Sequence, residues 1–410
     1  MPVEALQCKE CGETYGLEAR YACDNCFGPL EVSYDLSGVT ADSARRRIQA
    51  GPPTIWRYAD FLPFDAPPRT ALAAGITPLV RADRLAARLG LGEVWVKNDA
   101  ANPTHSFKDR VVTIALAKAR ELGYEVVACA STGNLANAVA AHAAASGLES
   151  YVFVPADLEE QKILATGVYG AHVVAVRGTY DDVNRLCTEL SAQRDWAFVN
   201  VNVRPYYAEG SKTLGFEIAE QLGFEPPDRV VVPIASGSLF TRIARGFEEW
   251  LSVGLLEGST PVMCGAQAAG CSPVAQAFET GSAVCQPVRP DTIAKSLAIG
   301  DPADGPYALE LARRTGGAID SVSEDEIREG IRLLAETTGV FTETAGGVTT
   351  AVLQRLAERG EIGPEERVVL VITGEGLKTL DAVRGSFQAH GVDASTESFW
   401  EAFDEERAIV

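Results

Sequence analysis

The chain has 410 residues, 46% of them hydrophobic, which is long enough for two lobes with sizeable cores. Its net charge of −20 argues against a nucleic-acid partner, which would need a basic surface, but allows an anionic small molecule in a locally positive pocket. No apolar run reaches the roughly 18 residues of a membrane span. The start, MPVEALQCKE, lacks the basic and apolar regions of a secretion signal. We therefore expect a cytoplasmic protein with no membrane partner.

Four of the nine cysteines form two closely spaced pairs near the start, CKEC and CDNC. An odd total without a secretion signal favours a reducing compartment over a disulfide framework. Paired CxxC spacing is typical of zinc sites. We predict that residues 1–40 form a zinc-ribbon-like module whose ligands are Cys8, Cys11, Cys23 and Cys26. Four ordinary reduced thiols are the alternative.

Residues 41–75 are rich in Pro, Arg and Ala and are predicted to be a linker or a surface arm. After them, short β-branched runs alternate with segments of helical period, which predicts an α/β fold with parallel sheets flanked by helices. The expected strands are EVWVK, EVVACA, SYVFVP, AHVVAV, WAFVN, RVVVPI, PVMCGAQ and RVVLVIT. The acidic, aromatic tail, residues 396–410, is expected to pack as a terminal helix.

The segment NPTHSFKDR has the pattern of a helix start, with Ser106 as the N-cap and Asp109 completing a capping box. Lys108 lies in the first turn of this helix, where the helix dipole disfavours a cation. A solvated lysine paired with Asp109 is one explanation. The other is an amine that bonds covalently to an aldehyde cofactor.

Four loops follow predicted strands and are expected at the same edge of an α/β sheet, where ligands bind. They are NDAANPTHSFKDR, ASTGNLANA, IASGSLFTR and TGEGLK. In the third loop, the small residues Ser236, Gly237 and Ser238 allow a phosphate to approach the backbone at a helix start. A simple tight turn would have the same sequence.

Together these loops resemble those of the fold-type II pyridoxal-phosphate enzymes, and among them the threonine synthases, over roughly residues 70–385. The resemblance implies that Lys108 holds pyridoxal 5′-phosphate. It also implies that Asn134 reaches the 3′ oxygen of the cofactor and that Thr373 meets the pyridine nitrogen. Ser131 and Thr132 match the loop that grips the substrate carboxylate.

The resemblance further implies that the cofactor phosphate binds at Ser236, Gly237, Ser238 and Leu239, and that ETAGG, Glu343–Gly347, lies near the cofactor plane. It implies two lobes and, by analogy, a homodimer. The large domain is expected over residues 76–104 and 201–395, and the small domain over residues 105–200.

Two positions depart from the family pattern. His105 replaces a glycine and is a candidate contact for the substrate phosphate. Tyr207 stands where relatives are expected to carry an arginine for that phosphate. Arg204 or Lys212 is then expected to supply the positive charge.

The activity implied by the resemblance is conversion of O-phospho-L-homoserine and water into L-threonine and phosphate. A cysteate synthase or a threonine or serine dehydratase would share the same loops, because discrimination lies in the leaving-group pocket. A zinc-ribbon adaptor on a decayed enzyme scaffold is the non-enzymatic alternative. The presence of Lys108, Asn134 and Thr373 argues against that alternative.

Overall fold

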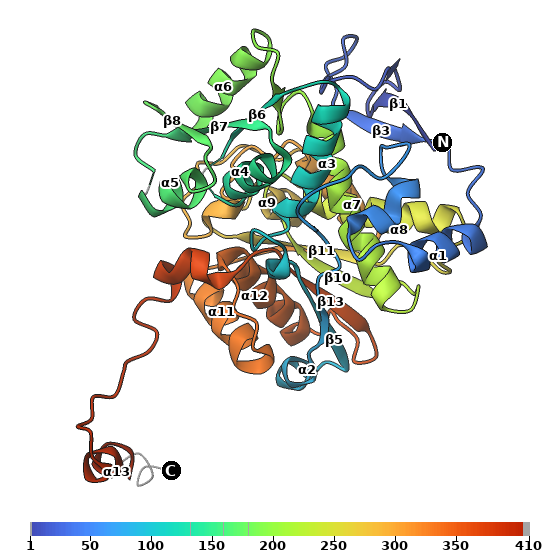
Figure 1. Cartoon of the computed structure of the whole chain (residues 1–410). Coiled ribbons are helices and arrows are strands. Elements are labelled where there is room, and N and C mark those ends of the chain that lie inside the picture. Colours follow the sequence, from blue (N-terminus) through green and yellow to red (C-terminus); the bar gives the residue numbers. More distant parts are fainter. Residues whose placement is uncertain (1, 132, 159, 179, 405–410) are drawn as a thin grey trace.

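Figure 1 shows the computed structural model of the chain, which describes residues 2–131, 133–158, 160–178 and 180–404. Two sheets flanked by helices form the main body, and a small β-rich module lies beside it. The α/β architecture with an added N-terminal module is as predicted. None of the helices in the described ranges is long and apolar enough to cross a membrane.

The N-terminal module is an antiparallel sheet of three strands in the order β2-β1-β3. The strands are β1 (Val3–Cys8), β2 (Thr14–Tyr15) and β3 (Leu30–Tyr34). The module contacts the main body through buried polar groups. Tyr34 Oη donates to Glu209 Oε2 at 2.6 Å, and Arg242 pairs with Glu31 at 3.1 Å.

The larger sheet of the body has six strands in the order β12-β11-β10-β13-β5-β4. All neighbouring pairs are parallel except the edge strand β4, which is antiparallel to β5. Four of these strands match predicted runs, whereas β4 and β12 were not predicted. The strands are β4 (Leu79–Arg81), β5 (Glu93–Asn98), β10 (Arg229–Pro233), β11 (Val262–Ala268), β12 (Ile319–Val322) and β13 (Arg367–Ile372).

Helices cover both faces of this sheet, and every residue of its central strand β10 is buried. Val230 and Val232 pack on one face with α7 (Arg204–Gln221), α8 (Ser238–Ser252), α9 (Pro273–Glu279) and α10 (Gly305–Arg314). Val231 packs on the other face with α2 (Asp83–Leu89), α11 (Glu324–Thr338) and α12 (Thr344–Glu358). Side chains that alternate between two buried faces explain the continuous valine runs.

The smaller sheet has four parallel strands in the order β8-β7-β6-β9. They are β6 (Val126–Ala130), β7 (Glu149–Pro155), β8 (His172–Val176) and β9 (Ala197–Phe198). All four match predicted runs, and β7 begins one residue before its run. The cluster on one face includes α3 (Lys108–Glu121) and α4 (Asn134–Ser146), and that on the other includes α6 (Tyr180–Ser191). The short helix α5 (Glu160–Gly167) leads into β8.

The segment predicted as a linker or arm contains α1 (Ala41–Ala50) and the 3₁₀ helix η1 (Ile55–Phe61). Ile48, Tyr58 and Phe61 from this segment are fully buried in the core beside α7 and α8. Three more 3₁₀ turns complete the fold: η2 (Asp99–Ala101), η3 (Lys295–Leu297) and η4 (Gly376–Val383).

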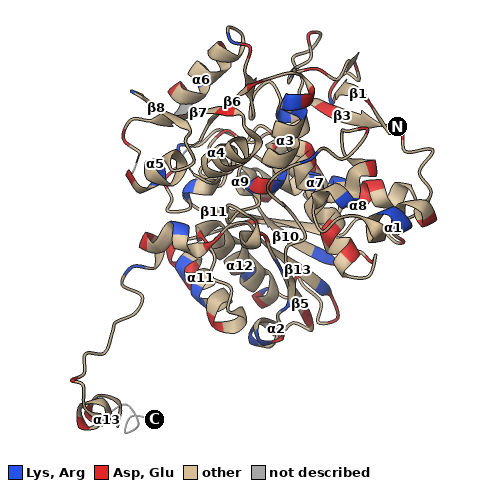
Figure 2. Ribbon diagram, in the orientation of Figure 1, with Lys and Arg blue, Asp and Glu red and all other residues tan. Residues whose placement is uncertain are grey.

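The tail forms the predicted helix, α13 (Thr396–Asp404), but this helix stands away from the body instead of packing on it (Figure 1). The expectation that it packs is therefore wrong. Elsewhere, acidic and basic positions lie interspersed along outer helices such as α1 and α11 (Figure 2). This distribution agrees with the charge serving solubility rather than forming a basic surface.

Candidate functional site

Three of the four predicted loops leave the larger sheet at the carboxyl ends of adjacent strands. Asn98 ends β5, Ile372 ends β13 and Pro233 ends β10, and these strands are neighbours in the order β10-β13-β5. The chain runs outward from β10 through β11 to β12 and returns to insert β13 between β10 and β5. Ligands of open α/β sheets bind at such a reversal of strand order.

The loop before Lys108 pairs directly with the loop after β13. Phe107 N donates to Thr373 O at 2.9 Å, and Glu375 N donates to His105 O at 3.2 Å. Ser106 and Gly374 form the antiparallel bridge between these two hydrogen bonds. This pairing places Lys108, at the start of α3, beside Thr373.

The structure corrects the predicted start of this helix. Phe107, not Ser106, is the N-cap, and the Asp109 carboxylate accepts from Thr104 N at 2.8 Å. Asp109 also bonds His142 Nε2 at 2.8 Å, so it does not pair with Lys108. Ser106 Oγ is buried and has no hydrogen-bond partner within the described ranges.

The amine of Lys108 points instead to α7. Lys108 Nζ lies 2.9 Å from Tyr207 Oη and 4.4 Å from the ring centre of Phe107. The side chain of Lys108 is partly exposed, so the amine is reachable by a small molecule. The explanation of Lys108 as a solvated lysine paired with Asp109 is therefore wrong, because its amine bonds to Tyr207 and Asp109 bonds to other groups.

The fourth loop comes from the smaller sheet, so the expectation of one shared sheet edge is wrong. Asn134, at the start of α4, nevertheless joins the site: its Nδ2 donates to Glu343 Oε2 at 2.9 Å. Its Oδ1 accepts from Lys378 Nζ at 2.8 Å. Lys378 also donates to Thr104 O at 2.6 Å. The edges of the two sheets therefore face each other across this cluster.

Burial sets the electrostatics of the cluster. Glu343 is 4% exposed, and burial raises its pKa, although Asn134, Lys378, Lys108 and Thr373 oppose the shift. Burial lowers the pKa of Lys378, partly offset by Glu343. Both shifts favour the neutral forms, as expected for charged groups removed from water.

The remaining residues of the Asn134 loop have structural contacts of their own. Ser131 is 7% exposed, and its Oγ accepts from Ala136 N at 3.2 Å in the first turn of α4. Thr132, the other predicted contact for a substrate carboxylate, lies outside the described residues.

The small-residue turn after β10 packs closely against Asp304. Gly237, the N-cap of α8, has φ +96°, and a Cβ at this position would lie 2.7 Å from Asp304 O. Asp304 N in turn donates to Ser236 O at 2.8 Å. Ser236 and Ser238 are half-buried at the start of a 15-residue helix, where anions are favoured. Leu239 is buried in the first turn of that helix.

The predicted contacts for a substrate phosphate differ in access. Arg204 starts α7, three residues before Tyr207, and pairs with Asp304 at 2.7 Å, next to the Ser236 turn. His105 is exposed with φ +61° in the loop before Lys108.

Lys212 does not reach the site. Its amine is fully buried between Glu209 at 2.5 Å and Glu249 at 2.9 Å. We therefore correct the interpretation of Lys212 as a substrate ligand, because an enclosed ion triad leaves it no contact with a bound molecule.

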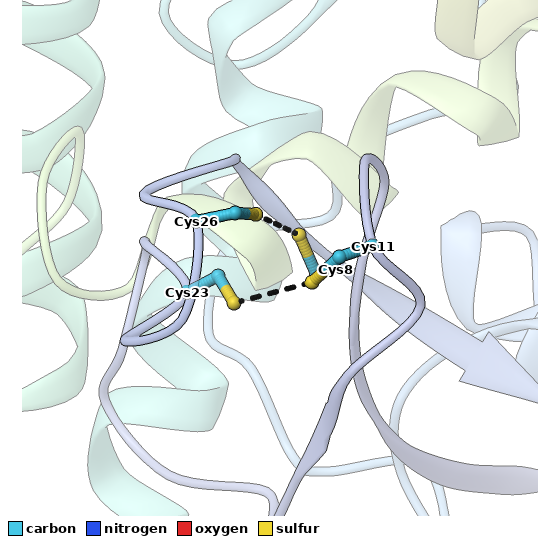
Figure 3. A group of neighbouring side chains, drawn as sticks. All are labelled: Cys8, Cys11, Cys23 and Cys26. Atoms are coloured by element: carbon cyan, nitrogen blue, oxygen red, sulfur yellow. Dashed lines mark hydrogen bonds between the residues drawn. The ribbon is translucent and has the colours of Figure 1, made fainter.

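The four predicted metal ligands lie together in the N-terminal module, with their thiols directed toward one another (Figure 3). All four sulfur atoms lie within 4.8 Å of one another, with Cys8 and Cys26 at 3.4 Å and Cys11 and Cys23 at 3.6 Å. A tetrahedral zinc with Zn–S bonds of about 2.3 Å needs sulfur atoms roughly 3.8 Å apart. The cluster could hold a metal.

Three contacts of the site were not predicted from the sequence: those of Tyr207, of Lys378, and of Asp109 with His142. Tyr207 was noted only as a departure, because nothing in the sequence links it to Lys108 across 99 positions. Lys378 is the last residue of TGEGLK, so the charge of this predicted loop could have indicated a role in the site. The third, the buried pair Asp109 and His142, follows from the packing of α3 on α4.

The residues present fit a phosphorylated aldehyde cofactor. Lys108 offers an accessible amine, Thr373 a hydroxyl at the end of β13, and the Gly237 turn a bare backbone at a helix start. Ser106 Oγ, between Lys108 and Thr373 in the paired loops, has hydrogen-bonding capacity that no described residue uses. A lysine amine and a helix start suited to an anion are the kinds of group that such a cofactor requires.

Comparison with known proteins agrees with this geometry. The family model described as pyridoxal-phosphate dependent enzyme matches residues 70–374. The chain is 39% identical over 376 residues to a threonine synthase of Methanosarcina acetivorans, covering 91% of this chain and 92% of that protein. It is 38% identical to a threonine synthase of Methanocaldococcus jannaschii, covering 92% and 93%.

Solved structures share the fold at low sequence identity. The processed form of threonine deaminase isoform 2 from Solanum lycopersicum matches with a TM-score of 0.64 and 19% identity, covering 98% of this chain and 97% of that one. O-ureido-L-serine synthase matches with a TM-score of 0.62 and 21% identity, covering 80% and 96%. Because the family model matches residues 70–374, the chain belongs to the pyridoxal-phosphate dependent enzymes.

Proposed function

We propose that the chain is a threonine synthase that converts O-phospho-L-homoserine and water into L-threonine and phosphate. The observation that carries the proposal is the Lys108 amine, which lies 2.9 Å from Tyr207 and follows a loop paired with Thr373. The chain is 38–39% identical to threonine synthases over most of its length. The proposed cofactor and the proposed substrate each carry a phosphate group, which would explain a turn suited to an anion.

The cofactor would be held by residues from all four loops. Lys108 would bond it covalently, Asn134 would reach its ring oxygen, and Thr373 would meet its ring nitrogen. Ser236, Gly237, Ser238 and Leu239 would bind its phosphate. When bound, the cofactor supplies an electron sink next to the α carbon of the amino acid.

The chain's own groups would move the protons and hold the substrate. The freed amine of Lys108 would take a proton from Cα, release it, and then take one from Cβ. Phosphate would leave Cγ with the bonding electron pair, Cγ would gain a proton to become the methyl group, water would add its hydroxyl at Cβ, and a proton would return to Cα. Ser131 and Thr132 would bind the substrate carboxylate. Arg204 and His105 would contact the leaving phosphate, Arg204 by exchanging its partner Asp304 for the substrate.

Several finer assignments belong to the same proposal. We infer that the cysteine cluster binds zinc, because its sulfur spacing suits a tetrahedral ion. We also propose that the chain forms a homodimer. Its large domain would comprise residues 76–104 and 201–395, and its small domain residues 105–200. The division is supported by the separation of the two sheets.

The experiment is a phosphate-release assay on the purified, cofactor-loaded protein. O-phospho-L-homoserine should release phosphate and yield threonine, whereas O-phosphoserine should not. Free threonine and serine are included, because ammonia and a keto acid from either would identify a dehydratase. Release from phosphoserine with no release from phosphohomoserine would overturn the proposal in favour of a cysteate synthase.

A further inference from the structure

Tyr207 is the hydrogen-bonding partner of the Lys108 amine. The 2.9 Å contact joins the first residue of α3 to the first turn of α7. Within the part of the chain that the structure describes, no carboxylate forms an ion pair with Lys108. Besides Tyr207 Oη, the amine lies over the ring faces of Phe107 at 4.4 Å and Tyr207 at 5.6 Å.

The packing of α3 on α7 fixes this contact. Gly210, one turn after Tyr207, lies so close to α3 that a Cβ there would be 2.5 Å from Arg110 O. Arg110, two residues after Lys108, reaches back to α7 and donates to Thr213 Oγ1 at 3.1 Å. The two helices therefore hold Tyr207 Oη and the root of the Lys108 side chain at a set separation.

The chemistry of the pair suits an amine that changes its charge. A lysine ammonium donates to the phenol oxygen, and a neutral amine accepts from the phenol O–H. The contact can therefore persist in both states without a net transfer of a proton. A flexible four-carbon side chain that is released from a covalent bond would otherwise sample many rotamers.

We propose that Tyr207 is a positioning residue, which holds the Lys108 amine whenever that amine is not bonded to the cofactor. This inference rests on the proposed function, in which Lys108 works both as the covalent anchor and as a free amine. Tyr207 keeps the amine directed toward the first turn of α7. Hydrogen bonds to charged groups change rates or equilibria by about tenfold to hundredfold.

The test compares Tyr207→Phe with Tyr206→Phe. Both changes remove one phenol oxygen from the same turn of α7, but Tyr206 Oη donates to Glu18 O in the N-terminal module at 3.0 Å. The cofactor is removed from the full chain, pyridoxal phosphate is added back, and the rate of covalent bond formation is followed by absorbance. Thermal melting of both variants reports their folding.

Tyr207→Phe is expected to form the bond about tenfold more slowly than the unmodified chain, and Tyr206→Phe at the unmodified rate. In steady-state phosphate release, Tyr207→Phe should lower kcat with little change in KM, because the substrate's own contacts remain. Equal rates for Tyr207→Phe and the unmodified chain would overturn the inference, as would equal slowing in both variants. If the unmodified chain forms no covalent bond, the proposed function fails first and the inference falls with it.

Discussion

Asn134 Nδ2 lies 2.9 Å from Glu343 Oε2, although Asn134 follows a strand of the smaller sheet and Glu343 caps a helix on the larger one. Gly374 makes this contact possible, since a Cβ there would lie 2.5 Å from the Glu343 carboxylate. The two lobes therefore meet through a buried polar pair, and a molecule bound between Asn134 and Thr373 would touch both lobes.

Replacement of Asn134 by alanine should weaken pyridoxal-phosphate binding about tenfold, because a bond to the cofactor is lost and Glu343 and Lys378 each lose a partner. An absorbance titration of the cofactor-free chain measures the affinity. Asn137→Ala is the matched control. Asn137 lies one turn later in α4 and accepts from Thr166 at 2.9 Å, outside the cluster. Equal affinities in the two variants would remove Asn134 from the cofactor site.

Gly237→Ala should abolish tight cofactor binding, because the new methyl group would lie 2.7 Å from Asp304 O and would push the turn out of position. Gly258→Ala is the control: Gly258 has φ +98°, close to the +96° of Gly237, but open space around its Cβ position. Both changes strain the backbone by about 1–2 kcal/mol. Melting temperatures measure the backbone strain that both variants share. Titration with the cofactor then measures the additional effect of the clash at Gly237. A Gly237→Ala chain that binds the cofactor normally would refute the assigned turn.

The cysteine cluster should hold one zinc ion per chain. Elemental analysis of the purified protein is expected to give that ratio. The Cys11→Ser variant is expected to lose the metal. Because the module contacts α7 and α8 through Glu18, Glu31 and their partners, metal loss should also lower the melting temperature of the body. Cys271→Ser, at a buried cysteine outside the cluster, should keep its zinc. A metal-free protein as stable as the purified one would count against a structural zinc.

The fully buried Glu217 predicts how stability depends on pH. Burial alone would raise its pKa, but Arg110 and Lys97 outweigh burial and lower it to about 2. A carboxylate with a lower pKa in the folded chain than in the unfolded chain stabilises the fold above its unfolded pKa of about 4.3. That stabilisation is lost as the pH falls toward about 2.

Glu217→Gln should therefore destabilise the fold by about 3 kcal/mol at neutral pH, since two buried cations lose a charged partner. Its stability should also depend less on pH below about 5 than that of the unmodified chain. Urea unfolding at several pH values measures both effects. Glu225 is exposed and pairs with Arg367 at 3.0 Å. The control Glu225→Gln is therefore expected to change the free energy of unfolding by about zero. Identical pH profiles for the Glu217→Gln chain and the unmodified chain would contradict this account.

The sequence predicted the strands of the body where they are apolar and buried on both faces. It missed β4 and β12, because β4 has only three residues and β12, IDSV, carries two polar ones. One-sided helical periodicity also understated the burial of α3, where every residue from Asp109 to Ala119 is buried. Arg110 and Lys118 read as surface charges in a sequence, and only their partners in the fold reveal burial.

The candidate site was predictable where one segment carries its own signal, as around Lys108 and in the two cysteine pairs. Contacts between segments were not predictable. Local capping rules favoured Ser106 and an Asp109 pair, but long-range pairing with Thr373 and His142 decided the outcome. Lys212 was assigned a ligand role from its charge and from the resemblance of its segment to the family. Its two carboxylate partners lie on α7 and α8 in the folded chain.

The most direct test of this account locates the amine that bonds the cofactor. Borohydride reduction of the cofactor-loaded protein fixes the pyridoxyl group on that amine, and digestion with mass spectrometry identifies the peptide. The account predicts a single label on Lys108, absent from Lys108→Arg, which keeps the charge but cannot form the bond. A label on Lys97, Lys378 or another lysine, or no label on a protein that binds pyridoxal phosphate, would contradict it.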